Sequence, residues 1–144
     1  MVDLKSPKPQ VVIDTNVWIS GLIFGGKPAK IIEMFIDSSI VVVSSEELLS
    51  ELRRKIRSHF PLFLPHLPLF EASVREHALI VQLGSMPINL SRDVDDNMFI
   101  ETALIGNASY IISGDKDLLV LKNYKNIEIV NPANFLEQTR KYQK

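Results

Sequence analysis

The sequence predicts an α/β fold, a three-layer α/β/α sandwich around a central, mostly parallel sheet. Strand-length runs rich in Val and Ile alternate along the chain with segments of helical periodicity, the order typical of a sheet covered by helices. The runs are continuously apolar, which is typical of parallel strands buried on both faces. A chain of 144 residues fits one domain, which we place at 1–144.

Four segments have the strand pattern, and a fifth has it more weakly. Their β-branched residues pack well on a pleated surface. Strands are expected at 10–14, 40–44, 108–113 and 126–130, and the weaker candidate is 86–90.

The segments between these strands show the 3.6-residue period of amphipathic helices. Pro28 suits a first helical position, and Ser45 suits an N-cap. The stretch "FPLFLPHLPLF" at 60–70 carries three prolines, so we expect an irregular packed connection or an interface patch. Helices are expected at 28–38, 45–59, 70–84, 95–107 and 131–143.

Composition excludes several kinds of function. Cysteine is absent, which excludes disulfides, thiolate zinc sites and a cysteine nucleophile. The net charge of -1 provides no global basic field, so an anionic partner must be held by a local patch or a metal. No segment resembles a secretion signal, and no apolar run approaches the ~20 residues of a membrane span. We therefore expect a soluble, cytoplasmic protein with no membrane partner.

Aspartates stand where several of the predicted elements begin or end. Asp14 ends the first strand, Asp115 follows the strand at 108–113 by two residues, and Asp96 opens the helix at 95–107. Ligands of an open parallel sheet bind beyond the carboxyl ends of its strands, and neighbouring strands lie ~4.8 Å apart. These carboxylates can therefore come within metal-binding distance of one another.

Such a cluster of anions is costly, on the order of 3 kcal/mol for each pair at ~5 Å and an effective dielectric of ~20. A cation is needed to offset this repulsion. Because the ligands are oxygens, Mg²⁺ or Mn²⁺ is favoured. Such an ion can activate water and neutralise charge on a phosphodiester.

The helix at 45–59 adds acidic and basic candidates. Glu46 and Glu51 lie at the two flanks of its apolar face, and periodicity alone does not choose between them. The same helix carries a cationic run that suits a nucleic-acid backbone. The run consists of Arg53, Arg54, Lys55 and Arg57.

Each of these motifs also has a purely structural interpretation. The "DTN" at 14–16 suits a turn or helix cap. Asp93, Asp95 and Asp96, at the start of the helix at 95–107, suit its dipole. The "SGDKD" at 113–117 suits a loop with an N-cap. A solvated charged face accounts for most of the glutamates and the cationic run on the helix at 45–59.

Four motifs in order resemble the PIN domain family, in particular its small prokaryotic members that act as toxins of toxin–antitoxin pairs. They are "VVIDTNVWIS", "SSEELLSELRRKI", "DDNMFIETA" and "SGDKD", and the resemblance covers about residues 10–135. It implies a PIN-like, Rossmann-like sandwich. The resemblance also indicates that Glu51, and not Glu46, is the second acidic residue of the site. Ser113 stands where threonine is commoner in the family, which keeps the hydroxyl. By this resemblance the catalytic metal ligands are Asp14, Glu51, Asp96 and Asp115, with Asp117 as an accessory.

The resemblance implies a metal-dependent ribonuclease that hydrolyses RNA phosphodiester bonds with Mg²⁺ or Mn²⁺. We expect Asn16 and Ser113 to orient the ligands and Arg53, Arg54 and Arg57 to contact RNA phosphates. The family further implies a homodimer and a partner antitoxin.

Two other functions remain open. A haloacid-dehalogenase-like phosphohydrolase would use the "GDKD" motif, but it needs a second aspartate where Asn16 stands. A catalytically silent RNA-binding or scaffold module on the same fold is the stronger alternative.

Overall fold

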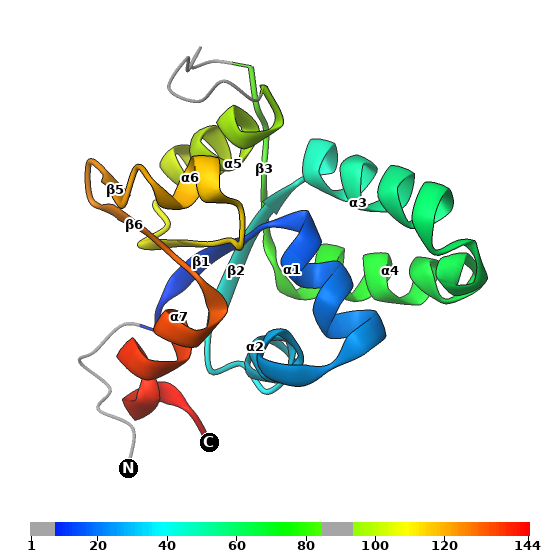
Figure 1. Ribbon diagram of the computed structural model, residues 1–144, viewed down its shortest axis with the longest axis horizontal. Coiled ribbons are helices and arrows are strands. Elements are labelled where there is room, and N and C mark those ends of the chain that lie inside the picture. The colour runs from blue at the N-terminus through cyan, green and yellow to red at the C-terminus, as the bar shows by residue number, and fades with distance from the viewer. Residues whose placement is uncertain (1–7, 85–93) are drawn as a thin grey trace.

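The computed structural model describes residues 8–84 and 94–144, with their side chains except those of residues 94–96. Within these residues six strands form one sheet in the order β3-β2-β1-β4-β6-β5 (Figure 1). All neighbours are parallel except β5 and β6, which are antiparallel. The strands are β1 Gln10–Ile13, β2 Val41–Ser45, β3 Leu79–Val81, β4 Tyr110–Ile112, β5 Asn123–Tyr124 and β6 Ile127–Val130.

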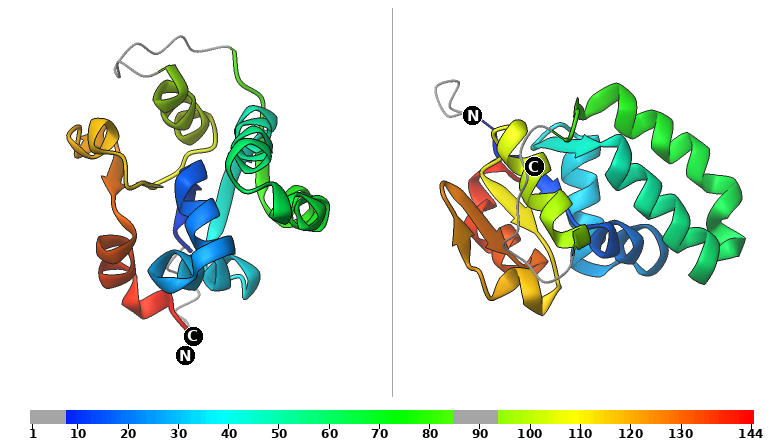
Figure 2. Two further views of the ribbon diagram at one scale, coloured as in Figure 1. Left: turned by 45° about the vertical axis from the view of Figure 1, so that its right-hand side comes forward. Right: turned by 90° about the horizontal axis from the view of Figure 1, so that it is seen from above.

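Helices cover both faces of the sheet, so the predicted three-layer α/β/α class is confirmed. The described helices are α1 Thr15–Ile19, α2 Gly26–Ile36, α3 Glu46–His59, α4 Leu67–His77, α5 Val94–Ile105, α6 Lys116–Leu119 and α7 Pro132–Gln138. Figures 1 and 2 show α5 and α6 on one side of the sheet, and α1 to α4 with α7 on the other.

Alternate residues of the central strand β1 serve two separate cores. Val11 and Ile13 belong to the core beneath α1 to α4 and α7, and Val12 belongs to the core beneath α5 and α6. Successive side chains of a strand point to opposite faces, so a strand buried on both faces must be apolar at every position. The continuous run "VVI" at 11–13 meets this condition.

The chain turns sharply between α1 and α2. The helix α1 continues into a π-helical turn, Ser20–Phe24, and Gly25 and Gly26 follow with φ of 88° and 70°, a region that glycine adopts without strain. At Gly21 a Cβ atom would lie 2.5 Å from Ile32 Cδ1 and 2.9 Å from the Pro28 carbonyl. Glycine therefore lets α2 pack closely against the preceding turn.

Several sequence-based boundaries are wrong. The helix expected at 70–84 is α4, which ends at His77, and the apolar residues after it form β3 and pair with β2. The edge of β2 takes this partner because its backbone groups need hydrogen bonds. The proline-rich stretch 60–70 is largely helical, with a 3₁₀ helix at Pro61–His66 and the first turn of α4.

Other elements of the structure were not predicted from the sequence, and one predicted strand falls outside the described residues. The sequence pattern predicts no element at α1, the π-helical turn, α6 or β5, all of which the structure contains. The last helix is α7 followed by a 3₁₀ turn, Arg140–Tyr142. The weak strand candidate at 86–90 lies outside the described residues. In the part of the chain that the structure describes, no helix has the length and apolar character needed to cross a membrane.

Candidate active site at the carboxyl edge of the sheet

Asp14 is the first residue after the central strand β1, and its carboxylate is buried, with 3% of the residue exposed. It caps α1 by accepting a hydrogen bond from the Asn16 N–H at Oδ1, at 3.0 Å. Its Oδ2 accepts a hydrogen bond from Ser113 Oγ at 2.6 Å. Both carboxylate oxygens are therefore held in place.

Ser113 connects the ends of β1 and β4. It follows β4 directly and is fully buried. Its hydroxyl donates to Asp14 and accepts from the Asp115 N–H at 2.9 Å. Asp115 in turn caps α6, because its Oδ1 accepts from the Asp117 N–H at 2.8 Å. One chain of hydrogen bonds thus sets the positions of Asp14, Ser113, Asp115 and the backbone of Asp117.

Burial raises the pKa of Asp14 above its usual 3.8, because the charged carboxylate loses water. The hydrogen bonds from Ser113 and Asn16 and the charge of Lys55 oppose this rise in pKa, and the negative charge of Asp115 adds to it. The ionised form of Asp14 is therefore destabilised in the folded protein, and a nearby cation would favour it.

Burial distinguishes the two glutamates that helical periodicity could not separate. Glu51 of α3 is 1% exposed, and its Oε1 lies 3.3 Å from Lys55 Nζ. Glu46 lies at the exposed start of α3 and forms a hydrogen-bonded ion pair with Arg75 of α4.

Lys55 links Glu51 to the residues that follow β1. Its Nζ also lies within 3.4 Å of Asn16 Oδ1, to which it donates a hydrogen bond. In the sequence, Lys55 stands out only as a member of the cationic run. The spacing of four residues from Glu51 was the signal for an ion pair on one helix face. Lys55 is thus a cation placed among the acidic residues.

Asp96 lies in the first turn of α5, and its side chain is outside the described part. In the chain α5 lies between β3 and β4, which are parallel members of one sheet. A helix that connects parallel strands must return from the carboxyl edge to the amino edge. The first turn of α5 therefore belongs to the same edge as Asp14 and Asp115.

Whether a metal ion fits this site depends on the carboxylate oxygens that could bind it. Among the side chains that the structure describes, no three Asp, Glu or His residues lie close enough together to hold a metal ion. The donors themselves suit a hard cation, because Asp14, Glu51 and Asp115 offer only carboxylate oxygens and the first two are buried.

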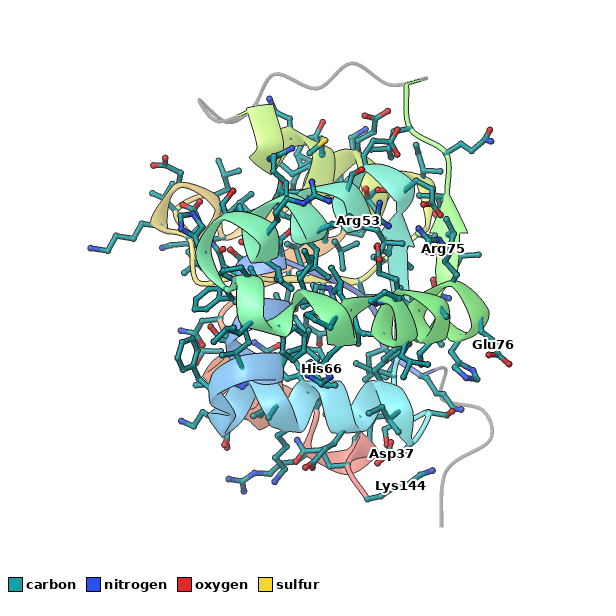
Figure 3. The ribbon with its side chains drawn as sticks, turned by 90° about the vertical axis from the view of Figure 1, so that its right-hand side faces the viewer. Asp37, Arg53, His66, Arg75, Glu76 and Lys144 are labelled. Carbon is teal, nitrogen blue, oxygen red and sulfur yellow. The ribbon has the colours of Figure 1, made fainter. Side chains whose placement is uncertain are left out.

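The residues of the cationic run on α3 differ in their surroundings. The guanidinium of Arg53 lies 2.6 Å from Glu71 Oε2 of α4, and Glu71 is buried, with 4% exposed. Figure 3 shows Arg53 and Arg75 on the paired helices α3 and α4. Arg54 and Arg57 are exposed. The expected phosphate contacts of Arg53, Arg54 and Arg57 stay predictions, and Arg53 has a structural partner that sequence analysis missed.

Together these features define an α/β protein with acidic residues at the carboxyl edge of a parallel sheet. A family model described as the PIN domain matches residues 10–117, and the chain belongs to this family. The family resemblance drawn from the four motifs is thereby confirmed. PIN domains are generally nucleases and generally use divalent metals. The chain is also similar to the uncharacterized protein MJ1680 of Methanocaldococcus jannaschii, with 33% identity over an alignment of 156 positions that covers 99% of each protein.

Asp14→Asn is expected to increase the free energy of unfolding at pH 7 in EDTA. The pKa of Asp14 is higher in the folded protein than its usual 3.8. As pH rises through 3.8, the Asp14 carboxyl therefore loses its proton in the unfolded chain first. The free energy of unfolding then falls until the pH passes the pKa of Asp14 in the folded protein. The gain from the amide should therefore disappear below about pH 3.8, where Asp14 is protonated in both states. Urea unfolding of both proteins at a series of pH values measures the difference in their free energies of unfolding.

Glu33→Gln is the matched control, because Glu33 is an exposed acid on α2 and its change to an amide should leave stability within about 0.5 kcal/mol. Equal stability of Asp14→Asn and wild type at pH 7 would show that the buried charge carries no penalty.

Arg53→Ala should lower the free energy of unfolding by about 1–3 kcal/mol, because it removes the closest charged partner of the buried Glu71 carboxylate. Arg57→Ala should change it by less than about 0.5 kcal/mol, since Arg57 is exposed. Thermal unfolding of the wild type and the two variants compares their stabilities. The double variant Arg53→Ala/Glu71→Gln should recover part of the loss, and no recovery would argue against an electrostatic origin.

Proposed function

We propose that this protein is a metal-dependent ribonuclease that hydrolyses phosphodiester bonds of RNA. The observation that carries the proposal is the buried carboxylate of Asp14, joined through Ser113 to Asp115 at the carboxyl edge of the sheet. Family membership supports nuclease chemistry, and this edge is where open parallel sheets bind their ligands.

In this proposal Asp14, Glu51, Asp96 and Asp115 hold Mg²⁺ or Mn²⁺, with Asp117 as an accessory. The bound ion supplies an activated water and neutralises charge that develops on the phosphodiester. Support comes from the all-oxygen donor set and from the raised pKa of Asp14, since burial leaves its negative charge in need of a cation.

The neighbouring residues position the acids. Ser113 and the Asn16 N–H each hold one oxygen of Asp14, which limits rotation of the carboxylate. Groups that orient metal ligands in this way strongly affect affinity and activity. Arg54 and Arg57 extend from the exposed side of α3 and provide the positive charge for phosphate contacts.

We further propose that the protein is the toxin of a toxin–antitoxin pair, that it forms a homodimer, and that an antitoxin protein is its partner. The support is the resemblance to small prokaryotic PIN-domain toxins. Exposed apolar side chains at Leu62 and Leu69, with 93% and 83% exposed, offer surface that a protein partner would cover.

Wild-type protein should cut a labelled single-stranded RNA in Mg²⁺ or Mn²⁺ and not in EDTA, as gel electrophoresis of the products can show. Asp14→Asn should lower the cleavage rate by roughly 100-fold or more, because it removes a ligand charge. Ser113→Ala should lower it by roughly 10- to 100-fold, the usual effect of losing a group that orients a metal ligand.

Ser113→Thr is the matched control and should stay active, because threonine keeps the hydroxyl that donates to Asp14. Folding of each variant is checked by circular dichroism. Cleavage that persists in EDTA, or that Asp14→Asn retains, would contradict the proposal. A folded wild type that binds RNA without cutting it would instead favour a catalytically silent module.

Induced production of the wild type in a bacterial host should arrest growth, because uncontrolled cleavage of RNA stops protein synthesis. Asp14→Asn at the same protein level should not arrest it. Growth curves and immunoblots measure both quantities. Normal growth with a wild type that cuts RNA when purified would remove the toxin role and leave the ribonuclease proposal intact.

A further inference from the structure

A groove between α1, the π-helical turn that follows it and the last turns of α3 is lined by aromatic side chains and a lysine. Its volume is about 440 Å³. We call it the aromatic groove, and its lining residues are Asn16, Ile19, Ser20, Phe24, Lys55, His59 and Phe60.

One end of the aromatic groove lies at the acidic residues. Asn16 lines the groove, and its backbone N–H donates to Asp14 Oδ1 at 3.0 Å. Lys55 also lines it, with Nζ 3.4 Å from Asn16 Oδ1 and 3.3 Å from Glu51 Oε1. A molecule bound in the groove would therefore extend directly to the candidate active site.

The aromatic side chains of the groove contact one another and keep exposed surface. Phe24 ends the π-helical turn and is 72% exposed. One side of it meets Phe60 edge-on, with ring centroids 5.7 Å apart and planes at 77°. His59 is exposed, and its ring centroid lies 6.5 Å from that of Phe60. An aromatic ring with an open face can stack on another flat ring.

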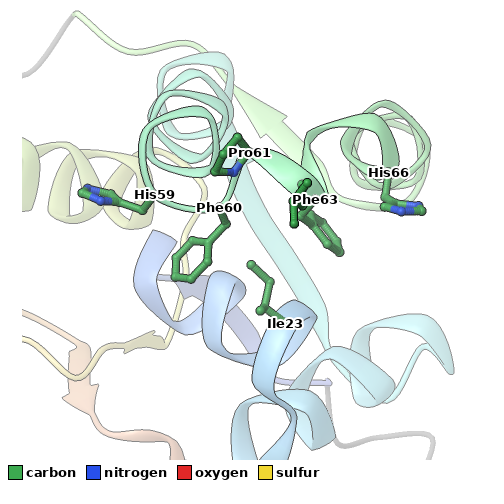
Figure 4. Close-up of a pocket in the computed structure, with 7 residues that line it drawn as sticks. Ile23, His59, Phe60, Pro61, Phe63 and His66 are labelled. Atoms are coloured by element: carbon green, nitrogen blue, oxygen red, sulfur yellow. The ribbon is translucent and has the colours of Figure 1, made fainter.

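A second pocket adjoins the first. It has a volume of about 510 Å³ and shares His59 and Phe60 with the aromatic groove. Ile23, Pro61 and Phe63 line it with them (Figure 4). The two pockets therefore meet at His59 and Phe60.

The charge of the aromatic groove indicates the kind of ligand. Lys55 and His59 are the ionisable side chains among the described residues that line it, and no carboxylate is among them. A ligand that suits this lining has flat apolar rings and negative charge. Single-stranded nucleic acid has both, with bases that stack on aromatic side chains and phosphates that pair with cations.

We propose that the aromatic groove binds single-stranded RNA next to the scissile phosphate, with one base stacked on Phe24 and the strand continuing past His59. This inference rests on the proposed ribonuclease function and adds a binding subsite to it. Bases of a duplex are stacked within the helix and are not available to Phe24, so the subsite selects unpaired RNA. Stacking tolerates any base, and recognition here depends on an unpaired strand more than on sequence.

Binding in EDTA tests the subsite without cleavage. The probe is a single-stranded RNA that carries 2-aminopurine, whose fluorescence falls when it stacks. Phe24→Ala should weaken binding by roughly 5- to 150-fold, the range for the loss of one base–aromatic contact, and should abolish the position-specific quenching. Phe24→Trp should keep both.

Ile36→Ala is the matched control, because Ile36 is also 72% exposed. It ends α2, which precedes β2, and so lies at the opposite edge of the sheet from Asp14. It should bind RNA like the wild type. Circular dichroism and the fluorescence of Trp18, which is buried, check that each variant is folded.

Equal RNA binding by Phe24→Ala and wild type would overturn the subsite, and so would a wild type that binds no RNA. The first result would leave metal-dependent cleavage standing, because that activity is measured separately. A shift of Phe24→Ala from dimer to monomer in light scattering, with RNA affinity unchanged, would also overturn it and assign the groove to a protein contact.

Discussion

The buried carboxylate of Asp14 is the constraint on which the rest of the candidate site depends. It stands at the end of β1, which has a parallel neighbour on each side and a core on each face, so water is largely excluded from it. An ionised carboxylate in such a place must have hydrogen bonds and a nearby cation. Ser113 and Asn16 supply the hydrogen bonds, and Lys55 supplies positive charge. Ser113, at the end of β4, meets part of this requirement, whereas the negative charge of Asp115 adds to the cost of ionising Asp14.

Helix α3 combines three tasks because its sides face different surroundings. Its apolar side packs Leu52 and Ile56 in the core, and Glu51 is buried beside them next to Lys55. Another side holds α4 through Arg53 and the buried Glu71. The end of the helix carries His59 into the aromatic groove. Stability and the candidate function therefore share one helix, and an effect of a substitution on RNA binding must be separated from its effect on folding.

The fold class could be predicted because parallel strands buried on both faces need continuous apolar runs, as at Val11, Val12 and Ile13. The boundaries of α4 and β3 could not be predicted in the same way. The apolar run at 78–81 suits a helix and a strand equally, and the open edge of β2 decides in favour of a strand. The close packing of Gly21, in the π-helical turn after α1, against α2 is likewise a contact with no local signal in the sequence.

The sequence by itself determined the α/β class, the order of the four acidic motifs and the absence of cysteine chemistry, because these follow from residue type and spacing along the chain. The tertiary structure alone decided which charged residues far apart in the chain meet. Glu46 and Glu51 are equivalent by periodicity, but the packing of α3 buries Glu51 and leaves Glu46 to pair with Arg75. Arg53 and Arg57 belong to one cationic run, but α4 brings Glu71 to Arg53. Contacts between residues far apart in the chain depend on how helices pack against the sheet, and local sequence does not specify that packing.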